Sequence, residues 1–312
     1  MASQISNREK KGILLILGTT LISGLSIFIN QFGVKVINPY IFTGLKNMVV
    51  VGLLFSAIFY LKEWPALRNL NRKQWLTLTL IGLVGGSIPF LLFFKGLAMA
   101  SGAEAAFLHK TMFIYVAVLA PLFLKEKISR KLLGAMFFLL LGNALLLKIG
   151  LNSVWGFGRG HFLILLATLF WASEQIISKK AVSFISPRIV AWGRMFFGFV
   201  FISIFWLVTG QLQLLSALSV KQIGWVLITA LFLFGYVMTW YTGLKYVRVS
   251  VAACLLTLGG PITALLSLVQ GKALSPAQLA GIFLISLGIV LVLNLFEKII
   301  YGRTKNRRPV FV

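Results

Sequence analysis

A chain of 312 residues in which 59% are hydrophobic and only 12% are charged is too apolar for a soluble globular domain, where about a quarter of residues carry charge. Its net charge of +24 comes from short connectors between apolar runs, which indicates membrane topology and argues against nucleic-acid binding. A single cysteine, Cys254, excludes an internal disulfide and a cysteine-based metal site.

Apolar stretches of about 20 residues, each long enough to cross a 30 Å hydrocarbon core as a helix, recur along the whole chain. The first follows a basic N-terminal segment like that of a signal peptide, but no small-residue cleavage site follows it, so we expect a permanent helix. Glycine, proline and charged clusters delimit the others. The sequence thus predicts ten transmembrane helices, over 12–30, 40–61, 74–95, 103–124, 131–149, 160–178, 188–209, 221–242, 249–270 and 277–297.

Basic residues are divided unevenly between alternate connectors. The N-terminus, the connectors after the second, fourth, sixth and eighth helices, and the C-terminal segment hold 21 Lys and Arg, whereas the opposite connectors hold 6. Because Lys and Arg accumulate in cytoplasmic loops, we expect both termini on the cytoplasmic side of the inner membrane. The segment 298–312 is then a basic cytoplasmic tail.

The chain also repeats itself with a period of about 146 residues. The segment FFKGLAMASGAEAA (93–106) matches WYTGLKYVRVSVAA (240–253), and 125–142 matches 271–288. Each unit holds five helices, an odd number, so the second unit must cross the membrane in the opposite sense. Two inverted units, 12–149 and 160–297, are typical of secondary carriers, whose site lies near mid-membrane between the units.

The repeated unit resembles the EamA domain of the drug/metabolite transporter superfamily, through GLAMASGAEAA, an apolar helix ending in FLKEKIS, and a glycine-spaced helix. The resemblance covers about 12 to 297. It implies an all-α membrane protein with ten transmembrane helices in two inverted five-helix repeats around a central cavity, carrying metabolites such as amino acids, often outward, without a prosthetic group. This chain departs from the pattern where Lys272 replaces the counterpart of Glu126, and where Tyr115 replaces the counterpart of Pro261.

Ionisable residues fall inside the predicted helices, where a charge costs about 2.5 to 3.5 kcal/mol on insertion scales and needs a partner, a wet cavity or a function. Glu174 and Arg194 lie at similar depth on the sixth and seventh helices. They form either an ion pair between these helices or a cavity wall that also holds substrate. Arg194 and Lys46 occupy the same position in the second helix of each repeat, which favours a packing role.

The fourth helix carries Glu104, His109 and Lys110 within seven positions. Lys110 lies deepest and is the first candidate for substrate contact. His109 is a candidate proton carrier, or a hydrogen-bonded packing residue. Glu104 shares a helical stripe with Tyr115 and either faces the cavity or is hydrated at the outer end of the helix.

Three further features complete the candidate site. Trp171 either covers the substrate or packs in the core. Gly259, Gly260 and Pro261 form a candidate hinge in the ninth helix, because proline removes a backbone hydrogen bond and glycine lowers resistance to bending. Pro89 marks a second candidate hinge, or a static kink, in the third helix.

Together these features predict a secondary carrier rather than an enzyme. With two histidines, one cysteine and six acidic residues, the chain offers no pattern of a metal centre or nucleophile triad. The slightly basic interior favours amino acids or organic anions, with protons as a candidate coupling ion and export by alternating access as the expected mode. Phosphorylated sugars, cationic drugs and a lipid-handling role remain as alternatives.

Overall fold

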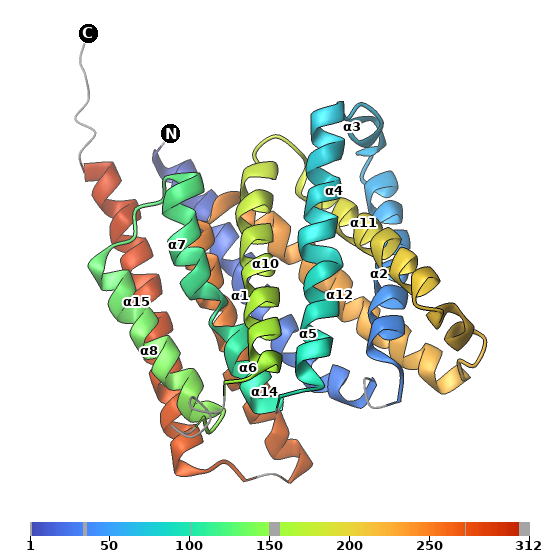
Figure 1. Ribbon diagram of the computed structural model, residues 1–312. Helices are drawn as coiled ribbons and strands as arrows, with labels where there is room; N and C mark the ends of the chain where they lie inside the picture. The colour runs from blue at the N-terminus through green and yellow to red at the C-terminus, as the bar shows by residue number, and fades with distance from the viewer. Residues whose placement is uncertain (1, 34–35, 101, 150–156, 272, 306–312) are drawn as a thin grey trace.

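The computed structural model describes residues 2–33, 36–100, 102–149, 157–271 and 273–305 as helices joined by short connectors, with no strand in these ranges. Figure 1 shows a single bundle in which α8 and α15 run side by side at one edge. The predicted all-helical class is therefore confirmed for the described residues. Lys272 and residues 306–312 of the predicted basic tail lie outside them.

The described residues of the first half form eight helices. They are α1 (Ala2–Gly33), α2 (Pro39–Tyr60), α3 (Trp64–Arg68), α4 (Arg72–Gly86), α5 (Ile88–Leu97), α6 (Gly102–Lys110), α7 (Met112–Leu124) and α8 (Arg130–Leu146). The second half follows with α10 (Arg159–Ala181), α11 (Pro187–Val208), the 3-10 turn η1 (Gln211–Leu215), α12 (Val220–Tyr246), α13 (Val249–Leu255), η2 (Leu256–Leu258), α14 (Gly259–Ser267), η3 (Leu268–Gln270) and α15 (Pro276–Lys305).

Within the described ranges, nine stretches are long and apolar enough to cross a bilayer. They are Asn7–Asn30, Pro39–Tyr60, Arg72–Leu97, Glu104–Leu124, Arg159–Ala181, Pro187–Val208, Val220–Tyr246, Val249–Gln270 and Pro276–Leu293. The predicted fifth span, 131–149, is α8, which has 17 residues and is shorter than the roughly 20 that a bilayer core requires. Nine of the ten predicted spans thus coincide with described helices that could cross a bilayer.

Side-chain caps explain where several helices begin. Asn71 and Gln74 form a capping box at the start of α4, and Ser219 and Gln222 form one at the start of α12. The Ser129 hydroxyl accepts a hydrogen bond from the backbone N–H of Leu132 at the start of α8. Each cap satisfies amides that a helix leaves unpaired in its first turn.

Close glycine contacts let helices from the two halves approach each other. A Cβ on Gly96 of α5 would lie 2.7 Å from the carbonyl oxygen of Gly160 in α10, and one on Gly243 of α12 would lie 3.1 Å from that of Gly12 in α1. Without hydrophobic driving force between helices in lipid, backbone approach through small residues supplies the van der Waals contact that holds such pairs.

The fourth predicted span of each half is interrupted at mid-length. Thr111 separates α6 from α7, and its hydroxyl donates to the Leu108 carbonyl at 2.6 Å. In the second half η2 separates α13 from α14, and the Thr257 hydroxyl donates to the Cys254 carbonyl at 2.7 Å. The hinge candidates Gly259, Gly260 and Pro261 begin α14, directly after this interruption.

The third span is interrupted at Ser87, whose backbone (φ −136°, ψ −74°) is not helical. Pro89 lies in the first turn of α5, directly after the break. Because proline has no N–H, the carbonyl of Gly85, four residues earlier, loses its intrahelical donor. The break therefore leaves a backbone acceptor free inside the bundle.

Candidate functional site

Buried polar side chains gather around the free carbonyl of Gly85. The indole N–H of Trp171 donates to this oxygen at 3.1 Å, and the Arg194 guanidinium donates to it at 3.2 Å. A Cβ on Gly85 would overlap the side chain of Glu174, so only glycine fits beside this carboxylate. Three predicted site residues from α10 and α11 thus meet at the end of α4.

Glu174 is 2% exposed, and its hydrogen bonds explain how a carboxylate is tolerated there. Its Oε1 atom accepts from the Ser178 hydroxyl and from the Tyr241 phenol, each at 2.6 Å. Arg194 has no hydrogen bond or ion pair with it among the described contacts; its guanidinium bonds the Gly85 carbonyl, and the Glu174 side chain lies beside Gly85. The sequence predicted that Glu174 and Arg194 lie at similar depth, but it did not indicate that Tyr241 bonds Glu174.

His109 belongs to an aromatic cluster around Trp171. Its ring centroid lies 4.8 Å from that of Trp171 and 5.7 Å from that of Phe93, both edge to face. Phe90 packs on Trp171 from the other side, at 5.1 Å. These contacts describe a packing residue, and the role of His109 as a proton carrier stays a prediction.

Lys110 is the last residue of α6, at the interruption of the fourth span, and is half-buried. Its Nζ atom lies 3.6 Å from the place that a Cβ of Gly259 would take, and Ser23 of α1 borders the same place at 3.4 Å. Within the described part of the chain, this ammonium has no hydrogen bond or ion pair. Tyr115, in the second turn of α7, is half-buried and packs against the core.

Lys46 occupies a separate position between α1 and α2. It is half-buried, donates to Asn30 Oδ1 at 3.2 Å, and lies 4.4 Å above the centre of the Phe42 ring. The Asn30 amide in turn donates to the carbonyl and the hydroxyl of Ser26, at 2.7 and 2.8 Å. Lys46 therefore does not join the cluster around Gly85.

Glu104 is paired at the start of α6. One of its carboxylate oxygens lies 3.4 Å from Nε2 of His161 on α10. His161 Nδ1 accepts the backbone N–H of Gly158 at 3.0 Å, which places the proton of the neutral ring on Nε2, facing Glu104. The sequence did not indicate this partner, because helical spacing within one span says nothing about which neighbouring helix faces it.

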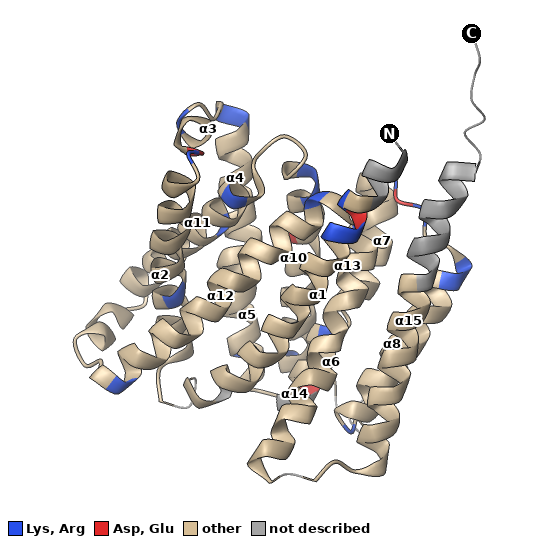
Figure 2. Cartoon of the chain, turned by 180° about the vertical axis from the view of Figure 1, so that it is seen from behind, with Lys and Arg blue, Asp and Glu red and all other residues tan. Residues whose placement is uncertain are grey.

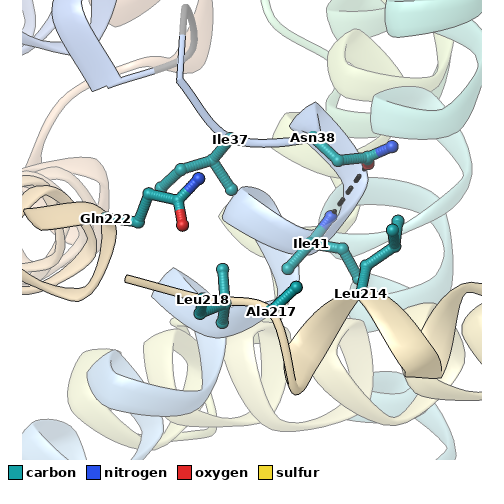
Figure 3. Close-up of a pocket in the computed structure, with 7 residues that line it drawn as sticks. All are labelled: Ile37, Asn38, Ile41, Leu214, Ala217, Leu218 and Gln222. Carbon is teal, nitrogen blue, oxygen red and sulfur yellow. Dashed lines mark hydrogen bonds between the residues drawn. The ribbon is translucent and has the colours of Figure 1, made fainter. Parts of the chain in front are cut away.

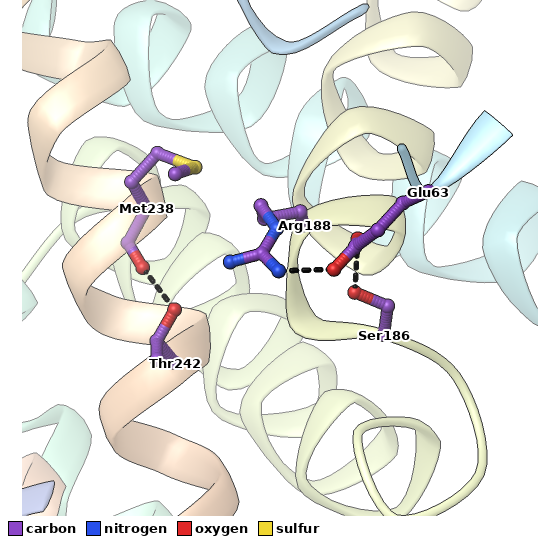
Figure 4. Close-up of polar contacts among 5 residues, drawn as sticks. All are labelled: Glu63, Ser186, Arg188, Met238 and Thr242. Carbon is purple, nitrogen blue, oxygen red and sulfur yellow. Dashed lines mark hydrogen bonds and ion pairs between the residues drawn. The ribbon is translucent and has the colours of Figure 1, made fainter. Parts of the chain in front are cut away.

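Two carboxylates outside the spans join the halves at the opposite end of the bundle. In Figure 4 the side chains of Arg188 and Ser186, at the start of α11, converge on Glu63, while Thr242 bonds the Met238 carbonyl in its own helix. Burial alone would raise the pKa of Glu63, but the hydrogen bonds and the charges of Arg188 and Lys245 outweigh it and lower that pKa.

Glu126, between α7 and α8, caps α13 of the other half. Its carboxylate accepts from the backbone N–H groups of Val249 and Ser250 at 2.9 and 3.3 Å, and from the Ser250 hydroxyl at 2.7 Å. A carboxylate is favourable there because the first amides of a helix are unpaired and carry partial positive charge.

A small pocket of about 140 Å³ opens where the starts of α2 and α12 meet the η1 segment. Figure 3 shows its lining, which is mostly aliphatic apart from Asn38 and Gln222. None of the predicted substrate residues lines it, so the central cavity stays a prediction. Nor do the described residues contain a group of three His, Cys, Asp or Glu that suits a metal ion.

Comparison with known proteins gives consistent results. The EamA-like transporter family matches residues 10–148 and again 158–294. An uncharacterized transporter, YyaM, of Bacillus subtilis (strain 168) is 22% identical over 284 residues, covering 89% of this chain and 92% of that protein. An uncharacterized transporter encoded in the cobO 3' region of a Sinorhizobium species is 28% identical over 99 residues, 32% of this chain and 70% of that protein. One crystal structure, 18% identical, superposes with a TM-score of 0.74 over 93% of this chain and 98% of that one, and so shares the fold.

Proposed function

Since the chain belongs to the EamA-like transporter family, we propose that it carries small carboxylate-bearing metabolites, amino acids or organic anions, outward across the inner membrane by alternating access. The units proposed to move are the two repeats, 12–149 and 160–297, each with five membrane-crossing helices; in the first repeat the fifth of these is the short α8. Three observations support this proposal.

The first is the contact between α8 and α15. If each residue is replaced by its counterpart in the other half, the same pairs of residues are in contact. A Cβ on Gly142 would meet Ile285 at 2.8 Å, and a Cβ on Gly288 would meet Leu139 at 2.8 Å. Gly142 corresponds to Gly288, and Leu139 to Ile285, in the repeat. Contacts that recur with their partners exchanged are typical of a two-fold relation, and they support the proposed inverted repeats.

The second observation is the matched interruption of the fourth span in each half, at Thr111 and Thr257. Interrupted helices near mid-membrane commonly form the substrate sites of carriers, because unwound backbone is tolerated there only beside protein or cavity water. The interruption at Ser87 and Pro89 adds a third such place.

The third observation carries the substrate assignment. The Lys110 ammonium is half-buried where α6, α14 and α1 meet, and no described residue balances its charge. A charge inside a membrane protein requires a counter-charge or water, and a substrate carboxylate would supply the former. Glu174 with Arg194, and His109 with Trp171, would form the adjoining wall. Protons remain the proposed coupling ion.

The orientation follows from charge. Figure 2 shows Lys and Arg gathered near α3 and the start of α1, with fewer at the opposite end. Since basic residues favour the cytoplasmic side, we place both termini there.

Uptake by purified protein in proteoliposomes tests the proposal. We expect accumulation of at least one labelled amino acid or organic acid, and stimulation by a pH gradient if protons are coupled. Lys110→Met should abolish this uptake, whereas Lys110→Arg should retain part of it. Uptake of phosphorylated sugars or cationic drugs alone would refute the assigned substrate class, and transport of nothing in a broad panel would refute the carrier.

A further inference from the structure

Two polar clusters in opposite halves of the chain occupy corresponding positions. The second helices of the two halves, α2 (Pro39–Tyr60) and α11 (Pro187–Val208), have the same length and begin 148 residues apart, as do the two family matches, at residues 10 and 158. With this spacing, the members of the two clusters correspond in three pairs: Lys46 with Arg194, Ser26 with Glu174, and Asn30 with Ser178.

The hydrogen bonds in the two clusters correspond as well. On α10 the Ser178 hydroxyl bonds the Glu174 carboxylate at 2.6 Å, and on α1 the Asn30 amide bonds the Ser26 hydroxyl at 2.8 Å. In each half, therefore, two side chains one turn apart on the first helix are joined, and the basic side chain of the second helix lies near them.

The clusters differ in charge. In the second half the Glu174 carboxylate lies beside Gly85, whose carbonyl accepts from Arg194, whereas in the first half the corresponding Ser26 is neutral. Lys46 is held by the Asn30 oxygen and the face of the Phe42 ring, and neither carries a full negative charge.

No carboxylate among the described side chains compensates Lys46. Glu63, Glu104 and Glu126 bond elsewhere. Glu9 lies 21 residues before Asn30 on α1, roughly 31 Å away along the helix axis. The Lys46 ammonium is thus half-buried without a counter-charge. In the other half of the chain, the corresponding cluster holds the Glu174 carboxylate.

A stripe of polar side chains on α1 runs from the neighbourhood of Lys110 to that of Lys46. Ser23, which like the Lys110 ammonium borders Gly259, is followed by Ser26 and Asn30 at intervals of three and four residues, which puts all three on one face of the helix. Ser23 and Asn30 are about 10 Å apart along the axis. The stripe leads from Lys110 toward the end of the bundle that holds the start of α2.

We propose that Lys46, Asn30 and Ser26 form a second anion site, in which the carboxylate of the transported metabolite takes the place that the Glu174 carboxylate has in the other half. The site rests on the proposed function and deepens it, since it lies between Lys110 and the outer face. Lys46 is seven residues inside α2, about 10 Å from that face.

Binding of a small carboxylate by the purified full chain in detergent tests the site apart from transport. The probe is trifluoroacetate, observed by fluorine NMR line broadening, with neutral trifluoroacetamide as the reference ligand. All variants carry Lys110→Met, so that binding at Lys110 does not contribute. We expect this parent to bind trifluoroacetate and not trifluoroacetamide.

Ser26→Glu places a carboxylate at the position that corresponds to Glu174, where it competes with trifluoroacetate for Lys46. It should therefore weaken trifluoroacetate binding about tenfold more than Ser26→Gln, which introduces a neutral side chain of the same size. Lys46→Met should likewise weaken binding about tenfold more than Lys46→Arg. Thermal unfolding and gel filtration show which variants fold, and if Ser26→Glu does not, the Lys46 pair decides.

Equal binding within the Lys46 pair, or no binding by the Lys110→Met parent, would overturn the second site even if the wild type transports. Conversely, loss of binding as expected in protein that transports nothing in proteoliposomes would leave the anion site standing and refute the carrier.

Discussion

Removal of the carboxylate that caps α13 should loosen the contact between the halves at the basic end of the bundle. Glu126 accepts three hydrogen bonds from Val249 and Ser250, at 2.7 to 3.3 Å. Glu126→Ala leaves the first amides of α13 without this partner and removes the favourable charge at the helix N-terminus. Losing a helix cap costs about 1 kcal/mol, and losing the interaction with the helix dipole adds about 0.3 to 1 kcal/mol.

Amide hydrogen exchange measured by mass spectrometry detects such a local change. A cost of 1.3 to 2 kcal/mol corresponds to exchange roughly 10 to 30 times faster in peptides that cover the start of α13. Glu126→Gln keeps the shape and one acceptor oxygen without the charge, so its effect should be about half as large in free energy. Peptides from α2 serve as an internal control, since no described hydrogen bond or ion pair joins α2 to Glu126.

Unchanged exchange at the start of α13 in Glu126→Ala would show that the cap contributes nothing measurable. An equal acceleration throughout the bundle would mean that the variant is globally destabilised, and would equally refute a local capping role.

Three further predictions concern packing and charge. Gly85→Ala should destabilise the protein by about 1 to 3 kcal/mol in detergent unfolding, because the new Cβ overlaps Glu174. Gly134 has open space beside it, so Gly134→Ala should be neutral or slightly stabilising. Equal effects of the two substitutions would refute the steric reason. Since the pKa of Glu63 is lowered, its ion pair with Arg188 stabilises the folded state above the unfolded pKa of about 4.3, and the advantage is lost as pH falls through the lower folded value. The melting-temperature difference between wild type and Glu63→Gln should therefore be constant from pH 8 to about 5 and vanish at lower pH; a constant difference at low pH would contradict it. Pro89→Ala restores an N–H to the Gly85 carbonyl, so it should straighten the third span and reduce transport; unchanged uptake would show that the free carbonyl is dispensable.

Hydropathy, together with the glycine, proline and charged residues that delimit the apolar stretches, predicted most of the fold. Apolar length located nine spans to within a few residues, since the bilayer thickness fixes how long a helix must be. The interruption at Thr111 was not predicted, because threonine is not a helix breaker and the break depends on packing against other helices. The one at η2 was expected from Gly259, Gly260 and Pro261, and lies just before them.

The sequence predicted which residues belong to the candidate site, but not which side chains contact each other there. The sequence indicated that Glu174, Arg194, Lys46 and Lys110 lie inside spans, where each needs an explanation. It did not indicate that Tyr241 shares the Glu174 carboxylate, since that contact joins helices whose relative rotation only the packed bundle sets. Proline four residues after Gly85 was an available signal for the free carbonyl.

The self-complementary packing of α8 on α15 also bears on how far the halves can diverge after a gene duplication. Each of the two glycine approaches has its own pair of neighbours, Gly142 against Ile285 and Gly288 against Leu139. A larger side chain at either glycine would push the two helices apart, so these positions limit how far the sequences of the two halves can diverge. A duplicated ancestor held together in this way resembles a homodimer whose subunits have been joined end to end.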